Sequence, residues 1–249
     1  MSFFANKWRG FKRKWKFFWS VNWYKTLYFN FKKFPFSIAM KLPVFFFGKV
    51  KFSDISGEIK IEAPITAAMI AFGHKFEKWS RHKGIAELSL IGKIVFKGYF
   101  HVGKDYLIYI GKDAYCEIGN MSAFGSDVKM ICTSEIRIGN WTGVGYESQL
   151  LDTNSHPMVN TKTGMQYPMV GAIELGDYNA ISNRVSIMPN TKTPNNCVIA
   201  SNSVCSKNYK GLGSCVLIGG IPAKLIKENY ARDWKFEKEK LIKNKVIKF

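Results

Sequence analysis

The chain has 249 residues, enough for one sizeable hydrophobic core, and 47% of them are hydrophobic. Its 37 lysines and arginines outnumber 18 acidic residues, so the net charge of +19 favours anionic partners. No apolar run approaches the roughly 20 residues that cross a bilayer, and the basic N-terminus lacks the apolar core of a signal peptide. A membrane-spanning protein is therefore disfavoured.

Residues 1–36 are predicted to form a basic, aromatic helical leader. Residues 1–53 contain twelve basic side chains and no acidic one. Helical spacing gathers large aromatics on one face, namely Phe4, Trp8, Phe11, Trp15, Phe18 and Trp19. They either pack on the body of the protein or lie among anionic membrane headgroups, which would give residues 1–36 peripheral membrane contact. No known nucleic-acid-binding motif accompanies the stretch, which disfavours nucleic acid as a partner.

From about residue 50 onward, short β-rich pieces separated by glycine replace the helical pattern. Phe124-Gly125 follows Ile118-Gly119 at six residues, and Val144-Gly145 follows Ile138-Gly139 at six. After an insert at residues 150–160, LLDTNSHPMVN, the rhythm becomes regular. From Leu175 the chain divides into the six-residue units LGDYNA, ISNRVS, IMPNTK, TPNNCV, IASNSV and CSKNYK.

A six-residue period is neither helical nor simple strand alternation. If each unit makes one short strand and one turn, three units close a triangular coil, and successive coils stack as parallel sheets. The first position of each unit then points inward, and glycine, serine and asparagine permit the tight corners. A β-sandwich would instead show strands every 8–12 residues. The period therefore predicts a mainly β, coiled fold.

Five cysteines, with no CxxC pair, argue against a disulfide framework and a zinc ribbon: Cys116, Cys132, Cys197, Cys205 and Cys215. Several occupy small-residue positions of the repeat, so we expect buried thiols in a reducing compartment.

Three segments carry a resemblance to a known family. They are the closing repeats IELGDYNAISNRVSIMPNTKTPNNCVIASNSVCSK, the exit GGIPAKLIKE, and the insert LLDTNSHP. Over roughly residues 57–227 the chain resembles the hexapeptide-repeat acyltransferases, a left-handed parallel β-helix family. It looks most like sugar O-acetyltransferases of bacterial surface-polysaccharide and lipopolysaccharide biosynthesis. The resemblance implies a leader at 1–49, a β-helix at 50–226 and a C-terminal helix at 227–249.

The resemblance implies an acetyl-CoA-dependent O-acetyltransferase that acylates a sugar hydroxyl of a surface glycan or its precursor. Such a hydroxyl needs a general base, and His156 occupies the non-repeating insert. The catalytic pair is therefore predicted to be His156 and Asp152, with Asp152 orienting the imidazole. A backbone carbonyl could orient the ring instead, and Asp152 could be a turn-forming residue. We expect His74, His82 and His101 to be structural. No nucleophile motif occurs, so direct transfer in a ternary complex is predicted, without a metal.

By the same resemblance, several residues match positions that contact coenzyme A: Asn183, Ser201, Ser206, Lys207 and Lys227. The two lysines suit its phosphates. The family usually forms homotrimers in which one subunit's histidine faces a neighbour's cofactor groove, and the implied location is cytoplasmic, peripheral on the inner face of the bacterial membrane. Ala180 replaces a usual tryptophan, and Gly125 falls near the usual acceptor-binding asparagine, so the acceptor is undetermined.

Two other functions remain open at this stage. An N-acetyltransferase acting on an amino nucleotide-sugar would differ only in its acceptor. A non-catalytic β-helix adaptor that docks on membranes through the leader would not require the histidine of the insert. A carbonic-anhydrase-like zinc enzyme is rejected, because the four histidines are not spaced to supply three zinc ligands.

Overall fold

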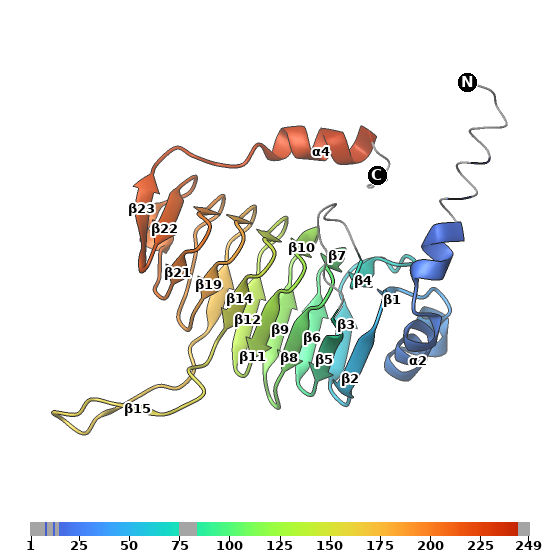
Figure 1. Ribbon diagram of the computed structural model, residues 1–249, viewed down its shortest axis with the longest axis horizontal. Helices are drawn as coiled ribbons and strands as arrows, with labels where there is room; N and C mark the ends of the chain where they lie inside the picture. Colours follow the sequence, from blue (N-terminus) through green and yellow to red (C-terminus); the bar gives the residue numbers. More distant parts are fainter. Residues whose placement is uncertain (1–7, 9–11, 13–14, 75–83, 244–249) are drawn as a thin grey trace.

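The computed structural model describes residue 8, residue 12, and residues 15–74 and 84–243. Its body is a stack of coils that runs along the long axis of the molecule (Figure 1). Three sheets, here called sheets I, II and III, form the faces of the stack. Helix α2 (Trp23–Lys33) lies at one end, helix α4 (Trp234–Lys243) lies alongside the coils, and a hairpin with β15 (Met158–Val159) projects outward.

The chain visits sheets I, II and III in turn. Within the described residues, sheet I runs β1 (Val44–Phe46), β4 (Ile70–Phe72), β7 (Phe100–Val102), β10 (Ser122–Phe124), β13 (Gly143–Val144), β18 (Ala180–Ile181), β20 (Val198–Ile199), β22 (Leu217–Gly220) and β23 (Ala223–Lys227). Sheet II runs β2 (Val50–Asp54), β5 (Ala86–Leu90), β8 (Leu107–Ile110), β11 (Lys129–Cys132), β14 (Gln149–Leu151), β19 (Ser186–Ile187) and β21 (Val204–Cys205). Sheet III runs β3 (Glu58–Ile61), β6 (Lys93–Phe96), β9 (Tyr115–Ile118), β12 (Glu135–Ile138) and β17 (Ile173–Leu175). Neighbouring strands are parallel, whereas β22 and β23 form an antiparallel hairpin.

The six-residue period determines which side chains fill the interior. First positions of the six units are all buried: Leu175, Ile181, Ile187, Thr193, Ile199 and Cys205. Fifth positions are buried as well: Asn179, Val185, Thr191, Cys197, Ser203 and Tyr209. The polar members have hydrogen-bond partners inside the stack. Asn179 Nδ2 donates to Thr193 Oγ1 at 2.5 Å, whereas Thr191 Oγ1 and Ser203 Oγ donate to the backbone carbonyls of Cys205 and Ala200 at 2.8 and 2.7 Å. The predicted fold class, a mainly β parallel β-helix with helices near both ends, is confirmed.

The corners are built differently from the sequence prediction. Successive corners between sheets I and II hold a residue with positive φ, and none of the five is glycine: Asp105, Asp127, Glu147, Arg184 and Asn202. The glycines serve close packing instead. A Cβ at Gly139 would lie 2.4 Å from the carbonyl carbon of Gly176 in the next coil, and one at Gly119 equally close to that of Gly139. Glycine therefore lets these coils stack, and among the described corners between sheets I and II it makes the turn only after β1 and β4, where Gly48 and Gly73 have positive φ.

Helix α2 closes the N-terminal end of the coil stack. Its Phe29 is buried, and Asn30 Nδ2 donates to the carbonyl of Val44 at 2.6 Å. Strand β1 thus begins at Val44, inside the range 1–49 assigned to the leader. A short helix, α3 (Phe36–Ala39), follows.

Much of the aromatic leader nevertheless remains exposed. The aromatics that face solvent include Trp8, Trp15, Phe17, Phe18, Trp19, Tyr24, Tyr28, Phe31 and Phe36. Phe4 and Phe11 of the predicted stripe lie outside the described residues. In the portion of the chain that the structure covers, no helix has the length and apolar character needed to cross a membrane. Packing therefore accounts for Phe29, but it does not account for most of the leader.

The C-terminal segment returns along sheet I. After a 3₁₀ turn at Lys210–Leu212, the β22–β23 hairpin ends and α4 runs back beside the coils (Figure 1). Trp234 Nε1 donates to the carbonyl of Tyr178 at 2.9 Å, which fixes the start of α4. The sequence predicted a helix at 227–249, and within the described residues the structure has α4 at Trp234–Lys243. Lys227 lies in β23 instead of in the helix.

Candidate functional site

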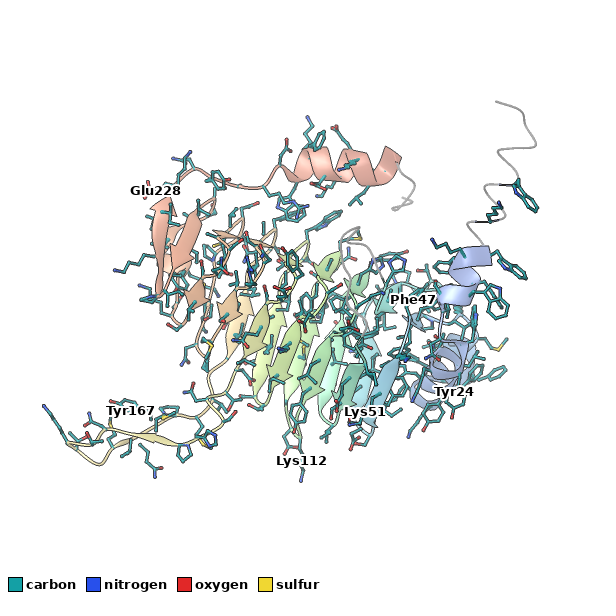
Figure 2. The ribbon with its side chains drawn as sticks, in the orientation of Figure 1. Tyr24, Phe47, Lys51, Lys112, Tyr167 and Glu228 are labelled. Atoms are coloured by element: carbon teal, nitrogen blue, oxygen red, sulfur yellow. The ribbon has the colours of Figure 1, made fainter. Side chains whose placement is uncertain are left out.

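The polar insert forms a β-hairpin, here called the arm (residues 153–170). It leaves the stack between β14 and β17, and Thr153 pairs with Val170 at its base. Strand β15 pairs antiparallel with β16 (Gln166–Tyr167) farther out. Figure 1 shows the arm projecting well clear of the coils, and Figure 2 shows Tyr167 on it.

His156 lies on this arm with its side chain exposed. Within residues 15–74 and 84–243 its imidazole has no hydrogen-bond partner. The arm also exposes a set of apolar side chains, namely Met158, Val159, Met165, Tyr167, Met169 and Val170. The predicted base is therefore accessible to a substrate or to a second protein surface.

Asp152 lies below the arm and is fully buried. One carboxylate oxygen accepts from the backbone N–H and hydroxyl of Thr133, both at 2.8 Å. The other accepts from the backbone N–H groups of Ser134 at 2.7 Å and Glu135 at 2.9 Å. Both oxygens are thus committed to the turn at residues 133–135, and no recorded bond joins Asp152 to His156. The geometry is that of the turn-forming role that the sequence left open.

The residues matched to cofactor contacts fall at separate places on the stack. Asn183 and Ser201 occupy successive corners between sheets I and II, where Ser201 Oγ donates to Asn183 Oδ1 at 2.8 Å. Ser206 and Lys207 directly follow β21, at the corner between sheets II and III. Lys227 ends β23, and its ammonium lies 5.5 Å from the ring centroid of Tyr230. The structure therefore brings four of the five residues together as two pairs and leaves Lys227 apart from both.

The arm and Lys207 belong to one edge of the stack. Gly171 N donates to the carbonyl of Asp152 at 2.8 Å, and Asn190 N of the next coil donates to the carbonyl of Gly171 at 3.2 Å. Lys192 N, in the same coil as Asn190, donates to the carbonyl of Lys207 in the following coil at 3.2 Å. The base of the arm and the Ser206–Lys207 corner are thus two coils apart along this edge.

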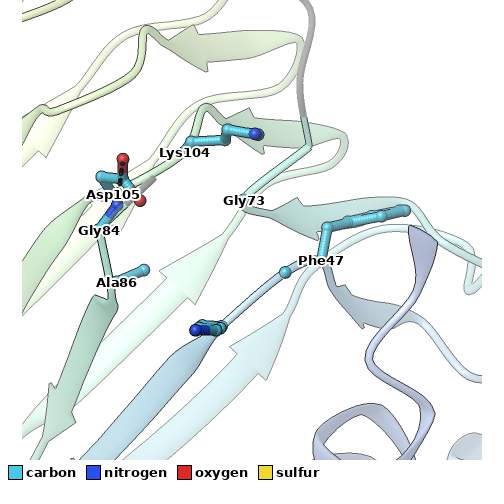
Figure 3. A pocket seen from close by; sticks show the side chains of 8 residues that line it. Phe47, Gly73, Gly84, Ala86, Lys104 and Asp105 are labelled. Atoms are coloured by element: carbon cyan, nitrogen blue, oxygen red, sulfur yellow. Dashed lines mark hydrogen bonds between the residues drawn. The ribbon is translucent and has the colours of Figure 1, made fainter. Parts of the chain in front are cut away.

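Two of the remaining histidines, His74 and His101, lie beside each other near the first coils, with ring centroids 6.2 Å apart. Burial lowers the pKa of both imidazoles, and it lowers that of His101 to about 4. His82 lies outside the described residues. Close to His74, a small hollow is lined by Phe47, Gly73, Ala86 and Lys104 (Figure 3). This hollow belongs to early coils, away from the corners that hold Asn183 and Lys207.

Sequence reasoning missed a larger groove between sheet I and α4. It has a volume of about 290 Å³ and is lined by Tyr99, Phe100, His101, Met121, Ser122, Ala123, Trp141, Thr142, Gly143, Arg232, Trp234, Glu237 and Leu241. The lining comes from residues 99–143 and 232–241, two segments 89 positions apart at their nearest ends, so no local motif predicts it. The two aromatic residues of "DWKF" at the start of the final helix were the available signal.

No family model matches the chain, and no curated protein matches it. Solved structures similar to the chain include several acetyltransferases and an N-acyltransferase of Bacillus cereus. A polySia-specific acetyltransferase, NeuO, is 16% identical, with 76% of this chain and 78% of that chain covered and a TM-score of 0.46. A hexapeptide-repeat acetyltransferase of Vibrio cholerae O1 biovar eltor, complexed with acetyl coenzyme A, is 20% identical, with 54% and 66% covered and a TM-score of 0.40. The polysialic acid O-acetyltransferase OatWY is 17% identical, with 74% and 90% covered and a TM-score of 0.39.

Proposed function

We propose that this protein is an acetyl-CoA-dependent O-acetyltransferase that acetylates a sugar hydroxyl of a surface glycan or its precursor. The observation that carries the proposal is the exposed His156 on an arm that interrupts an otherwise regular hexapeptide β-helix. A structural adaptor has no need of a solvent-facing imidazole on a projecting hairpin. An acyltransferase needs such a base, because a sugar hydroxyl is too weak an acid to attack a thioester unaided.

Direct transfer requires one proton relay. A ring nitrogen of His156 accepts the proton of the sugar hydroxyl as its oxygen attacks the thioester carbonyl carbon. The new C–O bond forms, the C–S bond breaks, and the imidazolium returns its proton to the departing thiolate. No covalent enzyme intermediate is required, and four of the five cysteines are buried. Coenzyme A leaves with a free thiol, which makes the reaction measurable.

Coenzyme A would lie on the later coils, held by the two pairs of corner residues and by Lys227. The ammonium groups of Lys207 and Lys227 are exposed and would meet its phosphates. The Asn183–Ser201 pair offers an amide and a hydroxyl to the polar pantetheine chain. The Asn183–Ser201 pair and the Ser206–Lys207 pair lie on opposite edges of sheet II. One cofactor would therefore contact one pair from one copy of the chain and the other pair from a second copy.

A homotrimer is the assembly that we propose. The apolar side chains of the arm are uncovered in one chain, and association would remove them from water. In that arrangement the arm carries His156 to the cofactor edge of a neighbouring subunit. Asp152 contributes by holding the base of the arm, and the group that orients the imidazole belongs to the assembled site.

Thiol release tests the proposed function. The purified protein is incubated with acetyl-CoA and a panel of sugars and glycans, and free thiol is measured over time. We expect release with at least one sugar acceptor and an acetyl ester in the product. An amide product would favour the N-acetyltransferase. No release, together with no binding of acetyl-CoA, would contradict the enzyme proposal and favour the adaptor.

We further propose peripheral membrane contact through the leader. Trp19, Tyr24 and Phe36 are each at least 66% exposed, and basic side chains surround them. Insertion of such side chains at an anionic headgroup layer is favourable. Replacing all three with serine is expected to weaken sedimentation with phosphatidylserine-containing vesicles by at least about tenfold, because apolar burial is lost.

This substitution spares the packing of α2, whereas deletion of residues 1–36 would remove Phe29 from the core. A matched control replaces Ile85, Ile221 and Ile242, which are exposed elsewhere, with serine. The control should sediment like the wild type. Equal sedimentation of the leader variant and the wild type would reject the membrane role.

A further inference from the structure

The groove between sheet I and α4 has a floor of small residues around one histidine. Outward-facing neighbours in register across sheet I are Ala71, His101, Ala123, Gly143 and Ala180. Because alternate strand residues face inward, Phe100 and Val102 fill the core while His101 stands on the outer surface. Among these, Ala123 and Gly143 line the groove beside His101 and leave room that larger side chains would fill.

The C-terminal helix forms the roof of this groove, and an aromatic cluster anchors it. Trp141 and Tyr178 occupy equivalent corners of consecutive coils, both with positive φ, so their rings stack with centroids 6.3 Å apart. Trp234 packs edge-on against both rings, and Lys238 Nζ lies 4.5 Å from the Trp141 centroid and 3.0 Å from Tyr178 Oη. These contacts hold α4 over sheet I without closing the space between them.

The groove combines apolar walls with a few polar groups. Aromatic surface comes from Tyr99, Trp141 and Trp234, and an ion pair comes from Arg232 and Glu237, whose Nη2 and Oε1 atoms lie 3.1 Å apart. Among the described residues no hydrogen bond is recorded for the His101 ring. Burial keeps its pKa near 4, so the imidazole is neutral at physiological pH and both donates and accepts.

This composition matches the chemistry of a sugar ring. A pyranose has apolar C–H faces that lie against aromatic side chains, and hydroxyls that require donors and acceptors around its rim. A volume of about 290 Å³ is at the small end of the range for ligand pockets, which suits one ring and not an extended chain.

We propose that this groove binds one pyranose ring of the sugar acceptor, with Tyr99 and Trp141 against the ring and with His101, Arg232 and Glu237 at its hydroxyls. The identification of the ring as part of the acceptor rests on the proposed function. The position supports it: Gly143 in the floor is the register partner of Ala180, three residues before the Asn183 corner. A ring in the groove would therefore lie next to the coils assigned to the cofactor.

Gly143→Val tests the assignment, because it adds apolar volume to the floor of the groove at a position that has room for a Cβ. A Cβ at this position would meet only Arg232 Nη1, at 3.6 Å. Binding to the full-length protein is measured by saturation-transfer NMR, with the methyl glycosides of glucose, galactose, N-acetylglucosamine and N-acetylneuraminic acid as probes. At least one probe should bind the wild type, and Gly143→Val should weaken it by about tenfold or more. His101→Ala should weaken it by about three- to tenfold, through loss of hydrogen bonds.

Gly211→Val is the matched control, since Gly211 faces open space outside the groove. It should bind the probe like the wild type, and all variants should keep acetyl-CoA binding. Equal probe binding by Gly143→Val and the wild type, or no binding of any probe to the wild type, would overturn the groove assignment. If Gly143→Val blocks the probe while no acceptor releases thiol, the groove stands as a sugar site and the proposed transferase function fails.

Discussion

His156→Ala is expected to lower kcat for acetyl transfer by about 10²- to 10⁴-fold, the usual contribution of a general base. The sugar hydroxyl would then have to lose its proton to water during attack. The apparent affinity for acetyl-CoA should change little, because the residues proposed to hold the cofactor lie on the coils. The measurement is thiol release at saturating acetyl-CoA, with product esters counted separately from hydrolysis.

The arm itself supplies the control for this variant. Lys162 lies farther out on the same hairpin, is exposed, and has no recorded side-chain hydrogen bond within the described residues. Lys162→Ala should therefore retain wild-type kcat. Neither substitution removes a buried contact, so both proteins should unfold at the wild-type temperature. Wild-type kcat in His156→Ala would assign the proton transfer to another group.

The β-helix was predictable because its signal is periodic. In a coil of three six-residue edges, each inward position repeats every six residues. Leu175, Ile181 and Ile187 can therefore be predicted as core residues without any long-range information. The interruption of the repeat was equally visible: the insert predicted at residues 150–160 contains the start of the arm, which continues to residue 170. Periodicity also explains why the role of glycine was misjudged. The sequence shows that a glycine recurs at the position of Gly139 in successive coils. Only the stacked coils show the reason, which is that a Cβ there would collide with the backbone carbonyl of the next coil.

The contacts of Asp152 were beyond the reach of that reasoning. Its partners at residues 133–135 belong to the preceding coil, 17 to 19 positions away, and the sequence offered a nearer candidate in His156. Proximity in sequence is a poor guide to the hydrogen-bond partner of a side chain at a corner, because the preceding coil presents its backbone N–H groups there. The groove under α4 was hidden for a related reason. Arg232 and Trp234 meet Gly143 only because the chain reverses after β23.

Asp152→Ala is expected to destabilise the fold by about 2–4 kcal/mol, since three backbone N–H groups and one hydroxyl of a partly buried turn lose their acceptor. The midpoint of urea unfolding should fall without a change in slope. Asp54→Ala is the matched control. Asp54 accepts one backbone hydrogen bond, from Ser56, in a solvent-exposed setting, so its removal should shift the midpoint far less.

The same pair of variants separates the two roles of Asp152. If the Asp152 carboxylate only shapes the turn, Asp152→Ala lowers the unfolding midpoint, and His156 keeps its function in the molecules that remain folded. If the carboxylate orients the imidazole in the assembled site, Asp152→Ala lowers kcat without a matching loss of stability. Four hydrogen bonds to residues 133–135 favour the first result. A wild-type urea midpoint combined with a kcat as low as that of His156→Ala would establish the second.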